Sequence, residues 1–287
     1  MSRIYRALEK AEEEKRQKAE QAPPVKVFEE RAAPKKERPT IKFPEEKKER
    51  IGKTEELRLP PKEEELPVLL FPRNSIAEEE FRKLKTQIFL RLPNPPHSIL
   101  ITSTGPGEGK TTVSVNLAMA ISKEIHRKAI LVDADLRKPS IHLENSRNAK
   151  GLSDYLSDGI PLTEVLINSQ TEKLQVIMAG PSTERSSELI ASKRMGEFLK
   201  SLRESAENTY ILIDSSPIIA TTEPTVLSKM VDGIILVVMA DRMPRESIQR
   251  AVRSIDRQKI IGIVFNRIDL KSSSYYSRHY YYKYYKK

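Results

Sequence analysis

The chain has 287 residues, no cysteine, and 50 lysines and arginines against 40 acidic residues, which gives a formal net charge of +10. The lack of cysteine excludes a disulfide framework and thiolate metal sites, and it is typical of the reducing cytosol. Half of the net charge lies on residues 271–287, which hold five basic residues and no acid, so the chain lacks the uniform basicity of a protein that coats nucleic acid.

Residues 1–72 are rich in charge and proline and poor in large apolar side chains. Such a segment buries too little apolar surface to offset its ordering entropy, so we expect it to be mostly disordered. A short amphipathic helix is expected within 2–20, where Ile4, Leu8 and Ala11 recur at helical spacing. This start has no apolar signal-peptide core, and no run in the chain is long enough to span a bilayer. We therefore expect a soluble cytoplasmic protein.

Short apolar runs alternate with helical patterns over residues 73–270. The runs are continuous rather than alternating, as in strands that are buried on both faces. We therefore expect one α/β domain with a mainly parallel sheet and helices on both of its faces. The expected strands begin near residues 98, 129, 174, 210, 233 and 261, and the clearest helical patterns cover 109–124, 187–206 and 245–257.

Glycines crowd the segment that follows the first run and opens a helix. Such glycines let backbone N–H groups approach phosphate oxygens, while a following lysine reaches the β- and γ-phosphates and a threonine hydroxyl binds Mg²⁺. Thr104 stands where the usual pattern has its first glycine, one residue before Gly105. The predicted nucleotide-binding residues are Gly105, Pro106, Gly107, Glu108, Gly109, Lys110, Thr111 and Thr112.

Carboxylates end two of the later strands. Asp133 and Asp135 follow the run that begins near 129, and Asp214 follows the run that begins near 210. Because ligands of open α/β sheets lie at the carboxyl ends of the strands, these side chains should face the glycine loop. A carboxylate there can hold Mg²⁺ or accept a proton from an attacking hydroxyl. The three segments together predict a P-loop NTPase.

The two aspartate-bearing segments also carry a family resemblance. ILVDADLR at 130–137 resembles the second Walker motif of the bacterial tyrosine kinases of capsule and exopolysaccharide synthesis, and ILIDSSP at 211–217 resembles their third motif. That family often has Thr-Pro where Ser215-Ser216 stands. The resemblance implies a MinD/ParA-like fold, with ATP and Mg²⁺ as cofactors. The opening MSRIYRALEKA resembles the start of kinases from exosortase-linked systems.

The resemblance implies a role for each site residue. Asp133 would accept the proton of the substrate tyrosine and would help Thr111 and Asp214 to hold Mg²⁺. Asp135 and Arg137 would position water and neighbouring charge. The remaining assignments are Gly107, Gly109 and Lys110 to the phosphates, and Asn266 to adenine, with a capping or turn role as the alternative for Asn266.

Seven tyrosines on residues 271–287 resemble the autophosphorylation substrate of that family. Glu79, Arg82 and Lys85 resemble its E-x-x-R-x-x-R oligomerisation motif, with lysine in place of the last arginine, so a ring-like homo-oligomer is implied. The family also implies a membrane-embedded polysaccharide co-polymerase as activator, a protein tyrosine phosphatase, and a cytoplasmic location peripheral to the inner membrane through that partner. The tyrosines are Tyr275, Tyr276, Tyr280, Tyr281, Tyr282, Tyr284 and Tyr285.

Two other interpretations remain open. A MinD/ParA-like partitioning ATPase would carry a signature lysine at the position of Gly105, and its absence disfavours that class. A non-catalytic nucleotide-binding scaffold could use the same motif residues. The basic tyrosine-rich tail could then stack on single-stranded nucleic acid, although with the kinase resemblance we expect no nucleic-acid partner.

Overall fold

The structure is a computed structural model that describes residues 70–268, apart from 73, 93, 144–148, 170, 172, 205–207 and 241. The helix expected within 2–20 and the tail tyrosines lie outside the described residues. The strands are β1 (Ser98–Ser103), β2 (Lys128–Asp133), β3 (Ile167–Asn168), β4 (Leu174–Ile177), β5 (Thr209–Asp214), β6 (Gly233–Met239) and β7 (Ile260–Asn266). The helices are α2 (Ile76–Arg91), α3 (Lys110–Ser122), α4 (Leu152–Asp158), α5 (Leu162–Val165), α6 (Ser186–Ala191), α7 (Lys193–Glu204), α8 (Glu223–Met230) and α9 (Arg245–Ser254), with a 3₁₀ turn at Arg257–Lys259.

The strands form one sheet in the order β3-β4-β2-β5-β1-β6-β7. Every neighbouring pair is parallel except β3 and β4, so the expectation of a mainly parallel sheet is confirmed. Asp133 and Asp214 are register partners at the ends of β2 and β5. The sheet therefore brings the two acid-bearing strand ends side by side.

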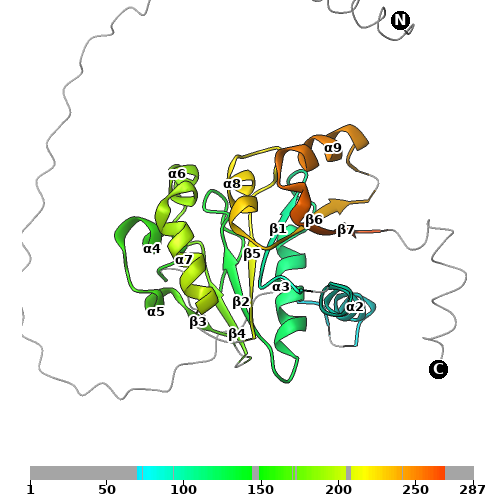
Figure 1. Cartoon of the computed structure of the whole chain (residues 1–287), viewed down its shortest axis with the longest axis horizontal. Helices are drawn as coiled ribbons and strands as arrows, with labels where there is room; N and C mark the ends of the chain where they lie inside the picture. Colours follow the sequence, from blue (N-terminus) through cyan, green and yellow to red (C-terminus); the bar gives the residue numbers. More distant parts are fainter. Residues whose placement is uncertain are drawn as a thin grey trace, which may run out of the picture. The chain divides into compact units, whose positions relative to one another are not determined.

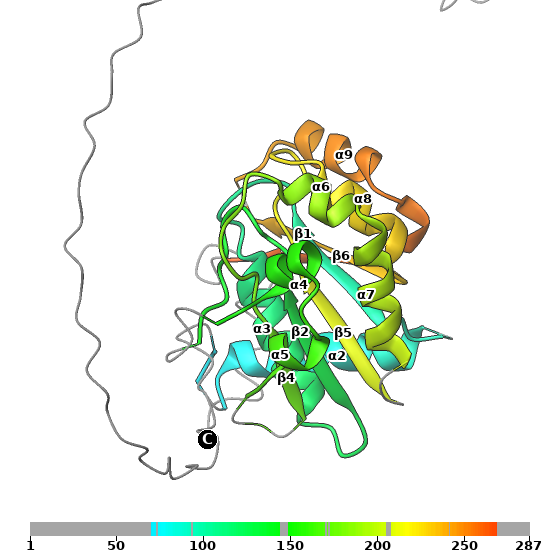
Figure 2. The same cartoon turned by 90° about the vertical axis from the view of Figure 1, so that its left-hand side faces the viewer.

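Helices cover both faces of the sheet, as the continuous apolar runs predict (Figure 1). Successive strand residues point to opposite faces, so Ile99 and Ile101 pack with α2 and α3, whereas Leu100 between them packs with the layer formed by α4 to α9. Figure 2 views the second layer from the front, with α4 and α7 before the strands and α3 behind them.

The helical pattern at 187–206 is split into α6 and α7, which the sequence did not predict. Ser192 lies between them in an extended conformation, and its hydroxyl accepts a hydrogen bond from the backbone N–H of Met195 (3.3 Å). A serine that caps the backbone in this way ends one helix and begins the next. The two-residue strand β3 was also not predicted, because it is too short to show a pattern.

Candidate active site

The glycine loop between β1 and α3 has the backbone shape of an anion site. Gly107 and Gly109 adopt positive φ values of 75° and 92°, which glycine tolerates better than other residues. The helix begins at Lys110, and its first ladder bond runs from Val113 N to Gly109 O (3.0 Å). The N–H groups before Val113 therefore have no partner within the helix, and together with the helix dipole they favour a bound phosphate.

Glu108 and Asn266 hold the loop in place. The Glu108 carboxylate is buried and accepts hydrogen bonds from Gly105 N (2.7 Å) and from Met239 N at the end of β6 (3.2 Å). The side-chain amide of Asn266 donates to the backbone oxygen of Glu108 (2.8 Å). Glu108 thus serves the folding of the loop, and the described contact of Asn266 is that of a residue that caps the loop.

Lys110 lies between two carboxylates. Its Nζ is 3.2 Å from Asp135 Oδ2 and 3.8 Å from Asp214 Oδ2. Burial alone would lower the pKa of this lysine, but the charges of Asp214 and Asp135 outweigh burial and raise it. The ammonium group is therefore held charged at the mouth of the glycine loop, where phosphates would need it.

Asp214 is fully buried at the end of β5 and is held by α3. Its Oδ2 accepts a hydrogen bond from Thr111 Oγ1 (2.6 Å), and its Oδ1 accepts one from Ser114 Oγ (3.2 Å). Burial raises the pKa of Asp214, and Lys110 and the two hydroxyls only partly oppose this. Ser114 was not predicted from the sequence, although its place one turn after Thr111 puts both hydroxyls on the same face of α3.

Asp133 is fully buried and is held by backbone amides. Its Oδ2 accepts from Ser140 N and Ile141 N (both 2.9 Å), and its Oδ1 accepts from Asp135 N (3.0 Å). Burial and the neighbouring Asp214 raise the pKa of Asp133 to about 7 despite these amides. A carboxyl group with a pKa near neutrality suits proton transfer at neutral pH. The carboxylate of Asp133 is held by these amides, and Asp135 is the residue of the pair that contacts Lys110.

Arg137 forms an ion pair that the sequence did not predict. Its Nε donates to Glu223 Oε1 on α8 (2.9 Å), which also accepts the hydroxyls of Ser186 and Ser187 at the start of α6. The Glu223 side chain is only 2% exposed. Burial alone would raise the pKa of Glu223, but the hydrogen bonds from Ser186 and Arg137 lower it to about 2. No local pattern identifies Glu223, because its partners come from other segments.

The predicted oligomerisation residues lie on α2. Arg82 pairs with Glu79 on the same helix (3.2 Å), and Lys85 pairs with Glu124, which follows the end of α3. The Lys85 side chain is 13% exposed. These contacts leave Arg82 at the surface and tie Lys85 to its own chain.

The donor set fits a magnesium nucleotide. Within the described ranges there is no group of three or more His, Cys, Asp or Glu side chains that could hold a metal ion by itself. Mg²⁺ in nucleotide sites needs only one or two carboxylates, because phosphates and water supply its other ligands. The Thr111 hydroxyl and the Asp214 carboxylate lie together beside the glycine loop, as that arrangement requires.

Comparison with known proteins identifies the family. Residues 97–261 match the family model of an AAA domain. The tyrosine-protein kinase YwqD of Bacillus subtilis is 31% identical over 209 residues, which are 70% of this chain and 86% of that protein. The chain belongs to the bacterial tyrosine-protein kinases. The kinase domain of Escherichia coli tyrosine kinase ETK has a TM-score of 0.61 to this kinase at 25% identity, over 71% of this chain and 80% of that one.

The fold is also similar to that of a cell division ATPase. The cell division ATPase MinD of Pyrococcus furiosus has a TM-score of 0.51 to this kinase at 23% identity, over 60% of this chain and 74% of that one. That likeness shows the fold alone, so the MinD/ParA-like architecture is confirmed while the family is that of the kinases. In the part of the kinase that the structure describes, no helix is both long and apolar enough to cross a bilayer.

Proposed function

We propose that this kinase transfers the γ-phosphoryl group of ATP to the tyrosines of its own C-terminal tail, mainly between subunits. In this proposal residues 73–270 are the kinase domain, 271–287 are the substrate tail and 1–72 are a charged segment. The single observation that carries the proposal is the placement of Lys110 between Asp135 and Asp214 at the glycine loop. The tail itself lies outside the described residues.

The residues of the site would have different roles in phosphoryl transfer. The loop from Gly105 to Thr112 would hold the phosphates, and Lys110 would neutralise their charge. Thr111 and Asp214, with Asp133, would hold Mg²⁺, which when bound offsets the negative charge of the phosphates. Asp135 fixes Lys110, and Arg137 supplies a further positive charge.

Asp133 is proposed as the base. The tyrosine hydroxyl would give its proton to the Asp133 carboxylate, its oxygen would bond to the γ-phosphorus, and the bond from that phosphorus to the departing ADP oxygen would break. What supports this role is the burial of Asp133 beside its register partner Asp214, which raises the pKa of Asp133 to about 7 and suits proton transfer at neutral pH.

The cellular role follows from the family. We propose that the kinase regulates the polymerisation and export of a capsule or exopolysaccharide, with a membrane-embedded co-polymerase as activator and a tyrosine phosphatase to reverse the modification. The kinase would then be cytoplasmic and peripheral to the inner membrane. Subunits would meet as a ring through Glu79, Arg82 and Lys85 on α2.

Incubation with labelled ATP and Mg²⁺ tests the reaction, in the presence of the cytoplasmic segment of the activator. The parent should incorporate phosphate on tyrosine, and Lys110→Met should incorporate none. Lys123→Met is the matched control, because Lys123 lies at the other end of α3 and pairs with Glu78 at the surface. Phosphate on serine only, or equal labelling of Lys110→Met, would contradict the proposal.

Deletion of residues 272–287 tests the acceptor. The truncated kinase should bind ATP as tightly as the parent but incorporate no phosphate. Full labelling of the truncated form would show that the tail is not the main acceptor. ATP binding without labelling in either form would instead identify a nucleotide-binding scaffold.

A further inference from the structure

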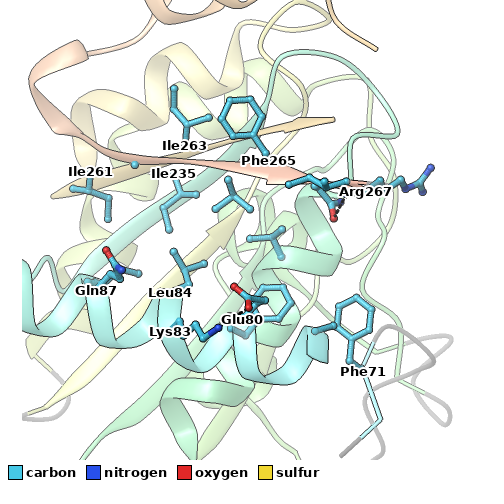
Figure 3. A pocket seen from close by; sticks show the side chains of 18 of the residues that line it. Phe71, Glu80, Lys83, Leu84, Gln87, Ile235, Ile261, Ile263, Phe265 and Arg267 are labelled. Atoms are coloured by element: carbon cyan, nitrogen blue, oxygen red, sulfur yellow. Dashed lines mark hydrogen bonds and ion pairs between the residues drawn. The ribbon is translucent and has the colours of Figure 1, made fainter. Parts of the chain in front are cut away.

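An apolar groove of about 850 Å³ lies between helix α2 and strand β7. Figure 3 shows its two walls running in opposite directions, with Gln87 near Ile261 at one end, and Phe71 near Arg267 at the other. Helix α2 packs on α3 within one core, but β7 is the last strand of the described sheet. The groove therefore runs along the last described strand, beside the place that one more strand of the sheet would take.

Within residues 70–268, β7 has no neighbour on its outer side, and it carries exposed apolar side chains. Among the described residues β7 pairs only with β6. Ile263 is 46% exposed and Phe265 is 59% exposed. An edge strand with free backbone groups and apolar side chains readily takes a further strand.

The described chain enters at one end of this groove. The Phe71 ring stacks on Phe81 of α2, with 5.8 Å between the ring centres, and the Phe71 N–H donates to Asn116 Oδ1 on α3 (3.1 Å). Leu70 packs on the core shared by α2 and α3. The residues just before it are Leu66, Pro67, Val68 and Leu69, an apolar run directly after a charged stretch.

We propose that residues 64–69 form an eighth strand that pairs in parallel with β7 and covers the groove. The chain must end this strand at Phe71, which lies where β7 also ends (Figure 3), so the two would run in the same direction. Six extended residues span about 20 Å, close to the length of β7. The residues that follow Ile268 at the same end are Asp269, Leu270, Lys271 and three serines, which suit an apolar groove less well.

The two-residue period of a strand determines on which face each side chain of residues 64–69 would lie. Residues two apart share a face, so Leu66 and Val68 would lie on the face of Leu70, which already packs on the core beside α2. Pro67 and Leu69 would lie on the opposite face. Glu64 shares this face at the start of the strand, so two of the three residues that the proposal directs towards the groove are apolar.

The hydrogen-bond direction in this sheet supports the parallel orientation. Ala134 and Ile211 face the α4–α9 layer, and their N–H groups point to the neighbour on the β7 side, whereas Ala129 faces α3 and its N–H points the other way. In a parallel eighth strand, residues facing α2 would therefore bond to β7. Pro67, on the other face, would point its nitrogen to solvent, as a proline in an edge strand must.

Hydrogen exchange in the full chain tests the strand. By the same rule, the N–H groups of β7 that point away from β6 are those of Ile263 and Phe265, and both should exchange slowly. In the double variant Leu66→Asp, Val68→Asp they should exchange faster by roughly tenfold or more, because a paired amide exchanges only when the strand opens. The matched control is the double variant Pro60→Asp, Pro61→Asp, which adds the same charge just before residues 64–69 and should leave the exchange unchanged.

Three outcomes would overturn the proposal. Equal exchange in the parent and the double variant would show that residues 64–69 do not pair with β7. Loss of protection after deletion of residues 269–287 would make the tail the occupant, and protection that grows with protein concentration would indicate a second copy.

A thiol reports on the groove independently, because the chain has no cysteine. A Gly262→Cys thiol, in open space, should react with maleimide more slowly in the parent than in the double variant.

Discussion

The buried carboxylate of Glu223 should make the stability of the fold depend on pH. Its pKa falls from 4.5 to about 2, since the hydrogen bonds from Ser186 and Arg137 outweigh the opposing effect of burial. A fall of that size corresponds to about 3 kcal/mol in favour of the ionised form. Because the pKa of the folded state lies below that of the unfolded chain, this stability is present above about pH 4.5 and is lost as the pH falls towards 2.

Replacement of Glu223 with glutamine removes the charge and keeps the shape. The amide oxygen can still accept the bond from Arg137, so we expect a loss of about 1–3 kcal/mol in the free energy of unfolding at neutral pH, shrinking as the pH falls below 4.5. Urea unfolding of both forms at about pH 7 and about pH 3.5 measures the difference. The control is Glu188→Gln, which removes a 71% exposed carboxylate paired with Arg185 and should cost at most about 0.5 kcal/mol.

Two results would refute this electrostatic account of Glu223. An equal loss at both pH values would mean that the substitution acts through packing rather than charge. No loss at neutral pH would mean that the ion pair between Arg137 and buried Glu223 contributes nothing net, because the cost of desolvation cancels the attraction. The same curves report the midpoint and the slope, so a change in the denatured state would be visible as a changed slope.

Three further substitutions test the loop and the helices. Gly109→Ala should weaken ATP binding at least about tenfold in equilibrium dialysis, because its Cβ would lie 2.0 Å from Asn266 Nδ2 at a φ of 92°. Gly196→Ala, on α7 with nothing within 4 Å of its Cβ, should instead raise the free energy of unfolding by up to about 1 kcal/mol. Ser114→Ala should lower it by about 1–2 kcal/mol in urea, because buried Asp214 loses a donor.

The layers of the fold could be predicted because each strand carries its own signal. β1, β2, β5 and β6 are continuous apolar runs, and a strand buried on both faces needs that pattern whatever its neighbours are. The break at Ser192 could not be predicted, because a helical pattern continues through it. The Ser192 hydroxyl caps the start of α7 by accepting a hydrogen bond from Met195 N, and this bond exists only once the second helix is in place.

The site residues likewise differ in whether a local sequence pattern predicts them. Lys110 and Thr111 were predicted because they follow a glycine loop, and Asp214 because it ends an apolar strand. The structure brings the three together. It could not be predicted that Asp135, rather than Asp133, also pairs with Lys110. Asp133 and Asp135 are two residues apart, and only the turn after β2, where three amides bind Asp133, leaves Asp135 to reach the lysine.

Glu108 lies within the nucleotide-binding motif, but its side chain holds the loop rather than facing a ligand. Its position inside the glycine loop predicts a place in the nucleotide site, yet its carboxylate turns inward to accept from Gly105 and from Met239 on β6. The loop backbone can point its N–H groups at phosphate only if something else fixes its shape, and here a buried side chain does so. The glycines bind through their backbone, so the residue between them is available to hold the loop on the sheet. Its substitution should therefore weaken nucleotide binding without any contact to the nucleotide.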